Sequence, residues 1–226
     1  DRRPRMRRGS VGKLRRVGGT GRKGRKGPNV SGHEERRGAT RDRIAAAMRT
    51  VRREEFLPGD MKRHAHMDSA LPIGHGQTNS QPRTVANMLE LLDVAPGARV
   101  LDVGSGSGWS TAILAELVGP EGEVHGVEIV PELVERGGRA VAVFDTPWAG
   151  IRQAEPGVLG LPDLAPFERI LVSAMAGSIP GELVDQLAPG GVMVVPADGE
   201  MYRVAKDADG EVSISAHGAY LFVPLV

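Results

Sequence analysis

The segment 102–108, with sequence DVGSGSG, has the residue types and spacing of a turn that could hold a ligand. A short apolar run, residues 99–103, precedes it, and a run with helical period, residues 109–118, follows it. Glycines in such a turn let the backbone approach a ligand closely, and the first N–H groups of the helix stay free. A dinucleotide-binding turn needs a small residue at the sixth place of its pattern, where this chain has Trp109. The pattern therefore indicates a ligand other than a dinucleotide.

The spacing G-x-G-x-G, with an acid two residues before the first glycine, resembles the first motif of S-adenosylmethionine (AdoMet)-dependent methyltransferases. AdoMet carries a sulfonium, an ammonium and a carboxylate but no pyrophosphate, so an acid such as Asp102 can be useful beside it. The resemblance implies that AdoMet is the cofactor and that S-adenosylhomocysteine (AdoHcy) is its product. By position it assigns to the cofactor Asp102, Gly104, Ser105, Gly106 and Gly108.

Glu128 lies near the end of the next apolar run, residues 123–130. An acid at the end of a second strand is placed to accept hydrogen bonds from both ribose hydroxyls. The alternative is an ordinary surface glutamate near the start of a helix, where it would interact favourably with the helix dipole. The order strand, glycine turn, helix, strand and acid favours the ribose role.

Apolar and helical patterns alternate along most of the chain, which predicts an α/β fold with a mostly parallel sheet and helices on both faces. Ligands of such sheets bind beyond the carboxyl ends of the strands. A further helix is expected from Thr40 to Pro58-Gly59, and residues 201–226 predict a hairpin around Asp209-Gly210 and a final strand. The other expected strands are residues 99–103, 123–130, 169–174 and 191–197, and the other expected helices are residues 109–118, 131–143 and 180–187.

A second polar segment, residues 71–82 with sequence LPIGHGQTNSQP, precedes a helix of the pattern Met-x-x-Leu-Leu. Taken alone, it would be a surface loop. Together the two resemble the signature of the protein-L-isoaspartate (D-aspartate) O-methyltransferase family. Four other stretches also match the pattern of this family. They are Arg53-Glu54-x-Phe56-Leu57-Pro58, the GSGSG turn, Pro166-Phe167 and the terminal Phe-Val-Pro-Leu. The resemblance covers about residues 42–226.

The resemblance implies a Rossmann-like, seven-stranded methyltransferase sheet with an antiparallel C-terminal strand. The implied reaction methylates the free α-carboxyl of an L-isoaspartyl residue and, more weakly, the β-carboxyl of a D-aspartyl residue. The ester collapses to a succinimide, whose hydrolysis returns part of the damage to normal aspartate. By position, Ser80 matches the active-site serine, and Gln77 and Thr78 flank the cofactor. The matched substrate-binding positions are Ile73, Gly74, Asn79, Phe222 and Val223.

Three positions depart from the family pattern. The family has Gly-Asp-Gly after its third strand, where the acid approaches adenine, and this chain has Glu155-Pro156-Gly157. Because proline offers neither an N–H nor an acceptor side chain, either Glu155 takes over, with Gly157 in the same loop, or the contact with adenine is weaker. His66 replaces an aromatic residue, and Asn79 replaces an isoleucine. These changes bear on affinity and substrate detail more than on the reaction class.

Methyl transfer to a carboxylate needs no strong base, because the nucleophile is already ionised near pH 7. The protein has to align two reactants and exclude water, an effect worth up to roughly 7–11 kcal/mol in ideal cases. Ser80 is therefore interpreted as a hydrogen-bond donor that orients the carboxylate, and the alternative is a serine that caps a turn. Trp109 could either line the cofactor cleft or pack on the sheet.

Composition sets the remaining expectations. Residues 1–40 hold 14 of the 29 Lys and Arg but 3 of the 28 Asp and Glu, and we expect them to be a disordered basic tail before a domain over residues 41–226. Cysteine is absent, which excludes disulfides and thiolate chemistry. His64-x-His66 lacks a third ligand, so no metal is expected. With no membrane-spanning run, we expect a cytoplasmic protein that is a monomer.

Two alternative functions stay open. One is a carboxyl methyltransferase that tailors an aspartate of a dedicated precursor peptide. It would need an extra substrate-binding region, which we do not expect after the terminal strand. The other is an RNA-binding or RNA-modifying protein that uses the basic residues 1–40. The chain lacks the Asn/Asp-Pro-Pro-aromatic motif of base-amino methylases, and nucleic acid is therefore a less expected partner than isoaspartyl proteins and peptides.

Overall fold

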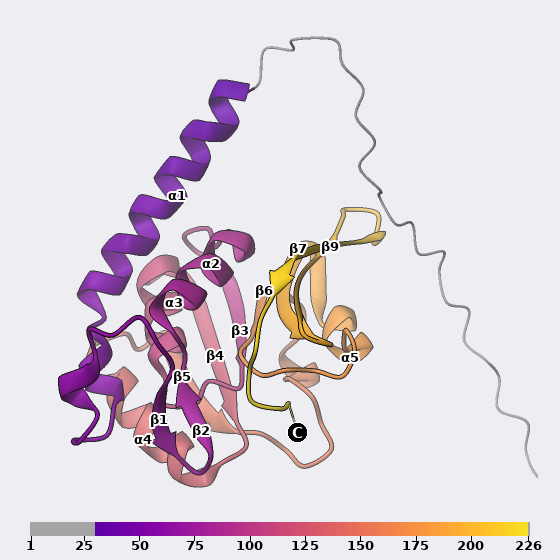
Figure 1. Cartoon of the computed structure of the whole chain (residues 1–226). Helices are drawn as coiled ribbons and strands as arrows, with labels where there is room; N and C mark the ends of the chain where they lie inside the picture. Colours follow the sequence, from indigo (N-terminus) through magenta and orange to yellow (C-terminus); the bar gives the residue numbers. More distant parts are fainter. Residues whose placement is uncertain (1–29, 226) are drawn as a thin grey trace, which may run out of the picture.

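A computed structural model describes residues 30–225, and their dominant feature is a seven-stranded sheet in the order β5-β4-β3-β6-β7-β8-β9 (Figure 1). The five strands from β5 to β7 run parallel, and β8 and β9 are antiparallel. This confirms the predicted α/β sheet with antiparallel strands at its C-terminal side. The strands are β3 Arg99–Val103, β4 Glu123–Glu128, β5 Ala149–Gln153, β6 Phe167–Val172, β7 Leu187–Ala197, β8 Glu200–Lys206 and β9 Val212–Ala219.

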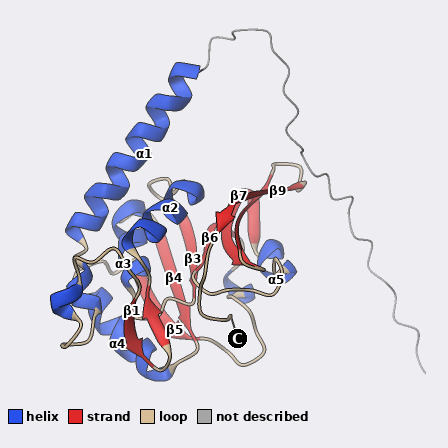
Figure 2. Ribbon diagram, viewed as in Figure 1, coloured by secondary structure: helices blue, strands red, loops and turns tan. Residues whose placement is uncertain are grey.

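Helices cover both faces of the sheet, as predicted (Figure 2). One apolar cluster joins the sheet to the first four helices and includes Leu89 and Ile113. The other joins it to α5 and η3 and includes Leu101 and Leu183. The helices are α1 Val30–Thr50, α2 Pro82–Leu92, α3 Trp109–Val118, α4 Pro131–Ala142 and α5 Gly181–Asp185, with short 3-10 helices η1 Arg53–Phe56, η2 Lys62–His64 and η3 Pro162–Leu164.

Helix α1 corrects the expected boundary at residue 40. It begins at Val30 and projects beyond the body of the molecule (Figure 1), so the expectation of disorder is wrong for residues 30–40. The buried Ile44, Ala47 and Val51 anchor its second half against α2 and α3. Once a helix is nucleated in this way, each upstream residue adds a hydrogen bond at little further cost. Residues 1–29 of the expected tail lie outside the described residues.

The polar segment 71–82 is a β-hairpin followed by the start of α2, and not the loop that its composition alone suggested. Strand β1 (Leu71–Gly74) pairs antiparallel with β2 (Gln77–Asn79), and Leu71 faces Asn79 across the pair. His75 and Gly76, at the turn, both have positive φ. Only Ser80 and Gln81 separate β2 from Pro82, the first residue of α2, and Ser80 lies with Gly104 at the carboxyl end of the sheet.

Two strand assignments differ from the sequence pattern. Strand β5 was not predicted, because residues 149–153 (AGIRQ) are short and have no apolar alternation. The predicted final strand after β9 is instead an isolated parallel bridge between Met175 and Pro224. Hydrogen bonds from Met175 N–H to the Val223 carbonyl (2.7 Å) and from Leu225 N–H to the Met175 carbonyl (2.8 Å) flank it. Proline has no N–H with which to extend a ladder.

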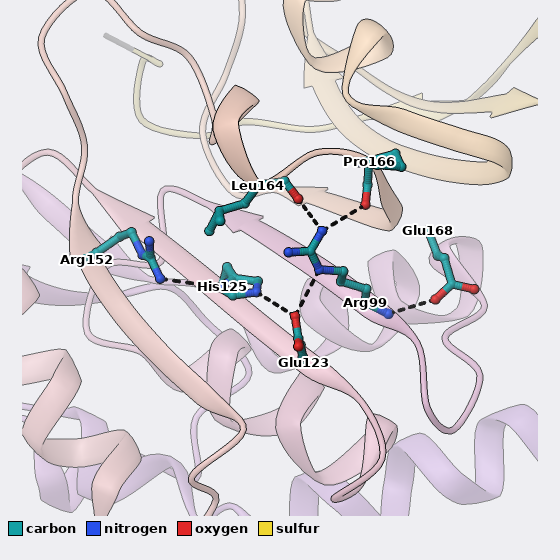
Figure 3. Close-up of polar contacts among 7 residues, drawn as sticks. All are labelled: Arg99, Glu123, His125, Arg152, Leu164, Pro166 and Glu168. Carbon is teal, nitrogen blue, oxygen red and sulfur yellow. Dashed lines mark hydrogen bonds and ion pairs between the residues drawn. The ribbon is translucent and has the colours of Figure 1, made fainter.

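The amino ends of the parallel strands carry a charged cluster (Figure 3). Glu123 accepts hydrogen bonds from Arg99 Nε (2.9 Å) and pairs with His125 Nε2 (3.1 Å), and these contacts lower the pKa of Glu123 below its ordinary value. Arg99 also stacks over Phe167. The cluster lies at the opposite end of the sheet from the glycine turn, so this His–Glu pair serves the amino edge and not the ligand site.

Candidate active site

Two adjoining cavities open beyond the carboxyl ends of β3, β4 and β6. The larger has a volume of about 380 Å³, which falls in the range of small-molecule sites. The smaller has a volume of about 40 Å³ and is lined by Ser80. Both are lined by Thr78 of the hairpin, by Gly104 and Gly106 of the glycine turn, and by Ser173. The two motifs identified in the sequence therefore meet at one site.

The glycine turn is fastened to the neighbouring strand β4. The N–H groups of Gly104 and Ser105 both donate to the Val127 carbonyl, at 2.9 and 3.0 Å. Gly104 and Gly106 have positive φ and line the cavities, as expected of residues that let a ligand approach the backbone. Ser105 lines the smaller cavity.

Gly108 has a packing role that the sequence motif did not indicate. It is not among the described residues that line either cavity. A Cβ atom at this position would lie 2.9 Å from Ile151 Cδ1 and 3.0 Å from the Gly137 carbonyl oxygen. Gly108 therefore allows α3 to begin in close contact with α4 and β5, and its expected role at the cofactor stays a prediction.

Asp102 lies behind the glycine turn, fully buried, and does not line either cavity. Its Oδ2 accepts hydrogen bonds from the hydroxyls of Ser110 and Thr111, both at 2.7 Å. Within residues 30–225, its Oδ1 has no hydrogen-bond partner. Burial raises the pKa of Asp102 to about 6, although the two hydroxyls oppose the shift. Asp102 thus lies behind the glycine turn and not at a cavity wall, and its expected contact with the cofactor stays a prediction.

Glu128 is held rigidly at the wall of the larger cavity. Its Oε2 accepts a hydrogen bond from Gly106 N–H (2.8 Å) and its Oε1 accepts one from Val130 N–H (2.9 Å). The carboxylate is nearly buried, yet it lines the larger cavity. Each oxygen keeps further acceptor capacity, so the group can still accept hydrogen bonds from a diol. The surface-glutamate alternative does not describe this position.

The rest of the larger cavity is mainly apolar. Ile129, 44% exposed, follows Glu128 directly, and Val158 lies in the loop after β5. That loop also brings Glu155, Pro156 and Gly157 to the cavity, where the sequence placed them. Such a surface can receive a flat aromatic ring, and a neighbouring carboxylate can hold hydroxyls.

The hairpin supplies the other wall. Gln77 lines the larger cavity, and Asn79 and Ser80 line the smaller one. Ser80 lies one residue before Gln81, the N-cap of α2, so it faces the cavity without capping the helix. Ile73 and Gly74 do not line either cavity: Ile73 is buried and packs against Gly106. These two expected substrate residues shape the hairpin instead.

The terminal segment contributes Val223 and Leu225 to the larger cavity. Phe222, which the resemblance also placed at the substrate, packs against the apolar cluster of α1 to α4. Trp109 lines the smaller cavity and also packs in the buried apolar cluster that includes Val100 of the sheet, while its indole N–H donates to the Val51 carbonyl (3.0 Å).

Arg53, quoted in the sequence analysis only as part of a family-like stretch, has a structural role beside the site that sequence reasoning missed. It is buried and donates to the Asn79 side chain and to several backbone carbonyls, including those of Ser69 (2.8 Å) and Ser80 (2.9 Å). Its guanidinium lies over the Trp109 ring, 5.3 Å from the centroid. Burial lowers the pKa of Arg53 to about 10, so it stays charged at neutral pH. In the sequence it resembles a surface charge beside Glu54 and Glu55, and no spacing signals its burial.

Within residues 30–225, no helix is long and apolar enough to cross a bilayer, and no three acidic or histidine side chains gather as a metal site.

Comparison with known proteins identifies the family. The family described as "Protein-L-isoaspartate(D-aspartate) O-methyltransferase (PCMT)" matches residues 29–226. This chain belongs to that family. A protein-L-isoaspartate O-methyltransferase from Methanopyrus kandleri is 45% identical over 191 residues, which cover 82% of this chain and 84% of the relative.

Solved structures of the PCMT family share the fold. One protein-L-isoaspartate O-methyltransferase superposes with a TM-score of 0.75 and 25% identity, over 85% of this chain and 65% of that one. Another, from Plasmodium falciparum and in complex with AdoHcy, gives a TM-score of 0.72 and 26% identity, over 86% of this chain and 95% of that one.

Proposed function

We propose that this protein transfers the methyl group of AdoMet to the free α-carboxyl of L-isoaspartyl residues in damaged proteins and peptides. The observation that carries the proposal is the position of Ser80, which lines the same small cavity as Gly104 and Gly106. Membership of the PCMT family supports it. The methyl ester then collapses to a succinimide, and hydrolysis of the succinimide restores part of the normal aspartate.

The larger cavity fits the cofactor. Its apolar wall at Ile129 and Val158 is suited to an adenine ring, and the fixed carboxylate of Glu128 is suited to the ribose hydroxyls. We assign the glycine turn at Gly104 and Gly106 to the remaining, charged part of AdoMet. When bound, AdoMet would supply a methyl group whose bond to the sulfonium sulfur can break as a carboxylate oxygen bonds to the methyl carbon, with AdoHcy leaving as the neutral thioether. Glu155 takes the place of the family's acid at the adenine end, because Pro156 has neither an N–H nor an acceptor side chain.

The residues of the protein have a limited task in this reaction. The incoming carboxylate is ionised at neutral pH, so no general base is needed. Ser80 donates a hydrogen bond that orients this carboxylate, and Gln77 and Thr78 separate the cofactor from bulk water. The terminal segment at Val223 lies beside the substrate peptide. Alignment and exclusion of water thus account for the catalysis that we assign to this chain.

We further propose that the protein acts as a monomer in the cytoplasm on isoaspartyl proteins. Neither the peptide-tailoring nor the RNA-directed alternative has an observation in its favour in residues 30–225. The exposed part of α1, residues 34–42, carries both acidic and basic side chains and no uniform basic surface.

The test is methyl transfer from labelled AdoMet to an isoaspartyl peptide, with the aspartyl peptide of the same sequence as control. We expect labelling of the first only, and AdoHcy should bind in a parallel titration. Equal labelling of both peptides, or labelling of neither, would contradict the proposal.

A further inference from the structure

Three buried polar side chains connect the hairpin to the glycine turn. Arg53 Nε donates to Asn79 Oδ1 at 2.7 Å, and Asn79 Nδ2 donates to Ser107 Oγ at 3.3 Å. All three residues are at most 5% exposed. The link therefore runs, almost fully buried, from η1 through the end of β2 to the turn between β3 and α3, and Asn79 and Ser107 also line the smaller cavity.

Asn79 is the centre of this link and is a departure from the family pattern, which has isoleucine there. An isoleucine could pack in this space but could not join two polar groups. A buried amide is costly unless both its donor and its acceptor are satisfied, and here Arg53 satisfies the acceptor and Ser107 a donor. The side-chain amide of Asn79 thus has a hydrogen-bond partner for its oxygen and one for its nitrogen.

Each end of the link is fixed to a functional element. Arg53 also donates to the backbone carbonyls of Asn79 (3.1 Å) and Ser80 (2.9 Å), so it holds the segment that carries the active-site serine. Ser107 follows Gly106, whose N–H is bonded to Glu128. A shift of the glycine turn would therefore move Ser107, the hydrogen-bond partner of Asn79. Asn79 and Ser80 are in turn both held by Arg53.

The geometry points to Asn79 as a positioning residue that couples occupancy of the cofactor cavity to the order of the Ser80 segment. This inference rests on the proposed function. A bound cofactor steadies the turn at Gly106 and Ser107, and through Asn79 it steadies residues 79–80. The binding site for the substrate carboxylate is then complete only when the methyl donor is bound. Binding at the cofactor site and binding at the carboxylate site are therefore linked by a coupling free energy.

The test uses the full chain and AdoHcy, with amide hydrogen exchange as the readout. In the unsubstituted protein, AdoHcy should slow exchange of the amides of Asn79 and Ser80 and of residues 104–106. In Ser107→Ala, which removes only the outer hydrogen bond, the slowing at 104–106 should persist while that at Asn79 and Ser80 is lost. The matched control is Ser213→Ala on β9, the strand at the edge of the sheet, where the hydroxyl bonds to the Ala205 carbonyl of β8; this variant should behave as the unsubstituted protein.

Peptide binding gives a second readout. AdoHcy should tighten binding of an isoaspartyl peptide by about tenfold in the unsubstituted protein and by less than about twofold in Ser107→Ala and Asn79→Leu. The affinity for AdoHcy alone should stay within about twofold in Ser107→Ala, which a direct cofactor contact of Ser107 would not allow. If both variants retain the coupling, or if only their unfolding temperatures change, Asn79 is a packing residue and the inference is wrong.

These outcomes separate the two proposals. A protein that methylates isoaspartyl peptides but shows the same protection of Ser80 in all variants would overturn only the coupling. A protein that fails to bind AdoHcy would overturn both.

Discussion

Glu128 Oε2 lies 2.8 Å from the backbone nitrogen of Gly106 and accepts its hydrogen bond. The acid at the end of β4 and the glycine turn at the end of β3 are therefore joined by a direct hydrogen bond. This bond orients the carboxylate toward the larger cavity before any ligand arrives. The cofactor does not have to order this side chain, so less binding free energy is lost to conformational entropy.

Replacing Glu128 by alanine should weaken AdoMet binding without a comparable change in turnover at saturation. The lost charge-assisted bonds are worth about 1.5–3 kcal/mol, or roughly 10- to 150-fold in Kd. Isothermal titration with AdoHcy measures the effect, and Glu132→Ala, an exposed acid in the first turn of α4, is the control. An unchanged Kd in Glu128→Ala would refute the ribose assignment.

Replacing Ser80 by alanine should lower turnover and leave the affinity for the cofactor nearly unchanged, the opposite of the effect expected for Glu128→Ala. Because Ser80 lines the smaller cavity, its loss should lower kcat by about 10- to 100-fold through misorientation of the carboxylate. The affinity for AdoHcy should change by less than about twofold, since Glu128 and Gly106 are untouched. Steady-state kinetics with an isoaspartyl peptide, beside a cofactor titration, separate the two quantities. Equal losses in kcat and in cofactor affinity would show that Ser80 does not act on the carboxylate.

The pKa of Asp102 predicts a pH dependence of stability. The folded state raises this pKa from 3.8 to about 6, so between these values the folded protein binds more protons than the unfolded chain. The stabilisation is fully present below about pH 4 and is lost as pH rises through 6, by about 3 kcal/mol in total.

Asp102→Asn removes this titration. The difference in unfolding free energy, unsubstituted protein minus variant, should therefore fall between pH 4 and pH 7. Urea unfolding at both pH values measures it. A difference that is constant, or that rises with pH, would contradict the buried and weakly paired state of Asp102.

Much of the fold was predictable because apolar period and turn chemistry agree along residues 99–197. The parallel strands β3, β4, β6 and β7 are runs that are buried on both faces, and such runs are conspicuous in a sequence. Strand β5 is only partly buried at one edge of the sheet, so its composition carries no such signal. The early start of α1 depends on contacts of Ile44 and Ala47 with other helices, which local composition does not report.

The site was predictable where a motif specifies a backbone conformation, as at Gly104 and Gly106. It was less predictable where tertiary packing decides the role. The burial of Arg53 depends on carbonyls from residues 65–80, far along the chain, and a side chain at Gly108 is excluded by contacts with α4 and β5. Asn79, read as a departure at the substrate, lines the smaller cavity and is also a buried bridge between Arg53 and Ser107, which the sequence did not indicate.

The neighbouring glycines of α4 provide a test of how closely this helix packs on the glycine turn. A Cβ at Gly137 would lie 2.9 Å from Ile151 Cδ1 and 3.1 Å from the Gly106 carbonyl oxygen, whereas a Cβ at Gly138 would meet nothing within 4 Å. Gly138→Ala should therefore stabilise the protein by about 0.5–1 kcal/mol through helix propensity. Gly137→Ala should destabilise it by about 1–3 kcal/mol, because the added methyl overpacks the contact.

Thermal unfolding compares the two variants, and each is the control for the other because both make the same change in the same helix. Gly137→Ala should also weaken AdoHcy binding, since relief of the clash pushes the turn away from Glu128. Gly138→Ala should leave this affinity unchanged. Similar stability changes in both variants would mean that α4 does not hold the turn in place, and that the Gly106–Glu128 bond is sufficient without it.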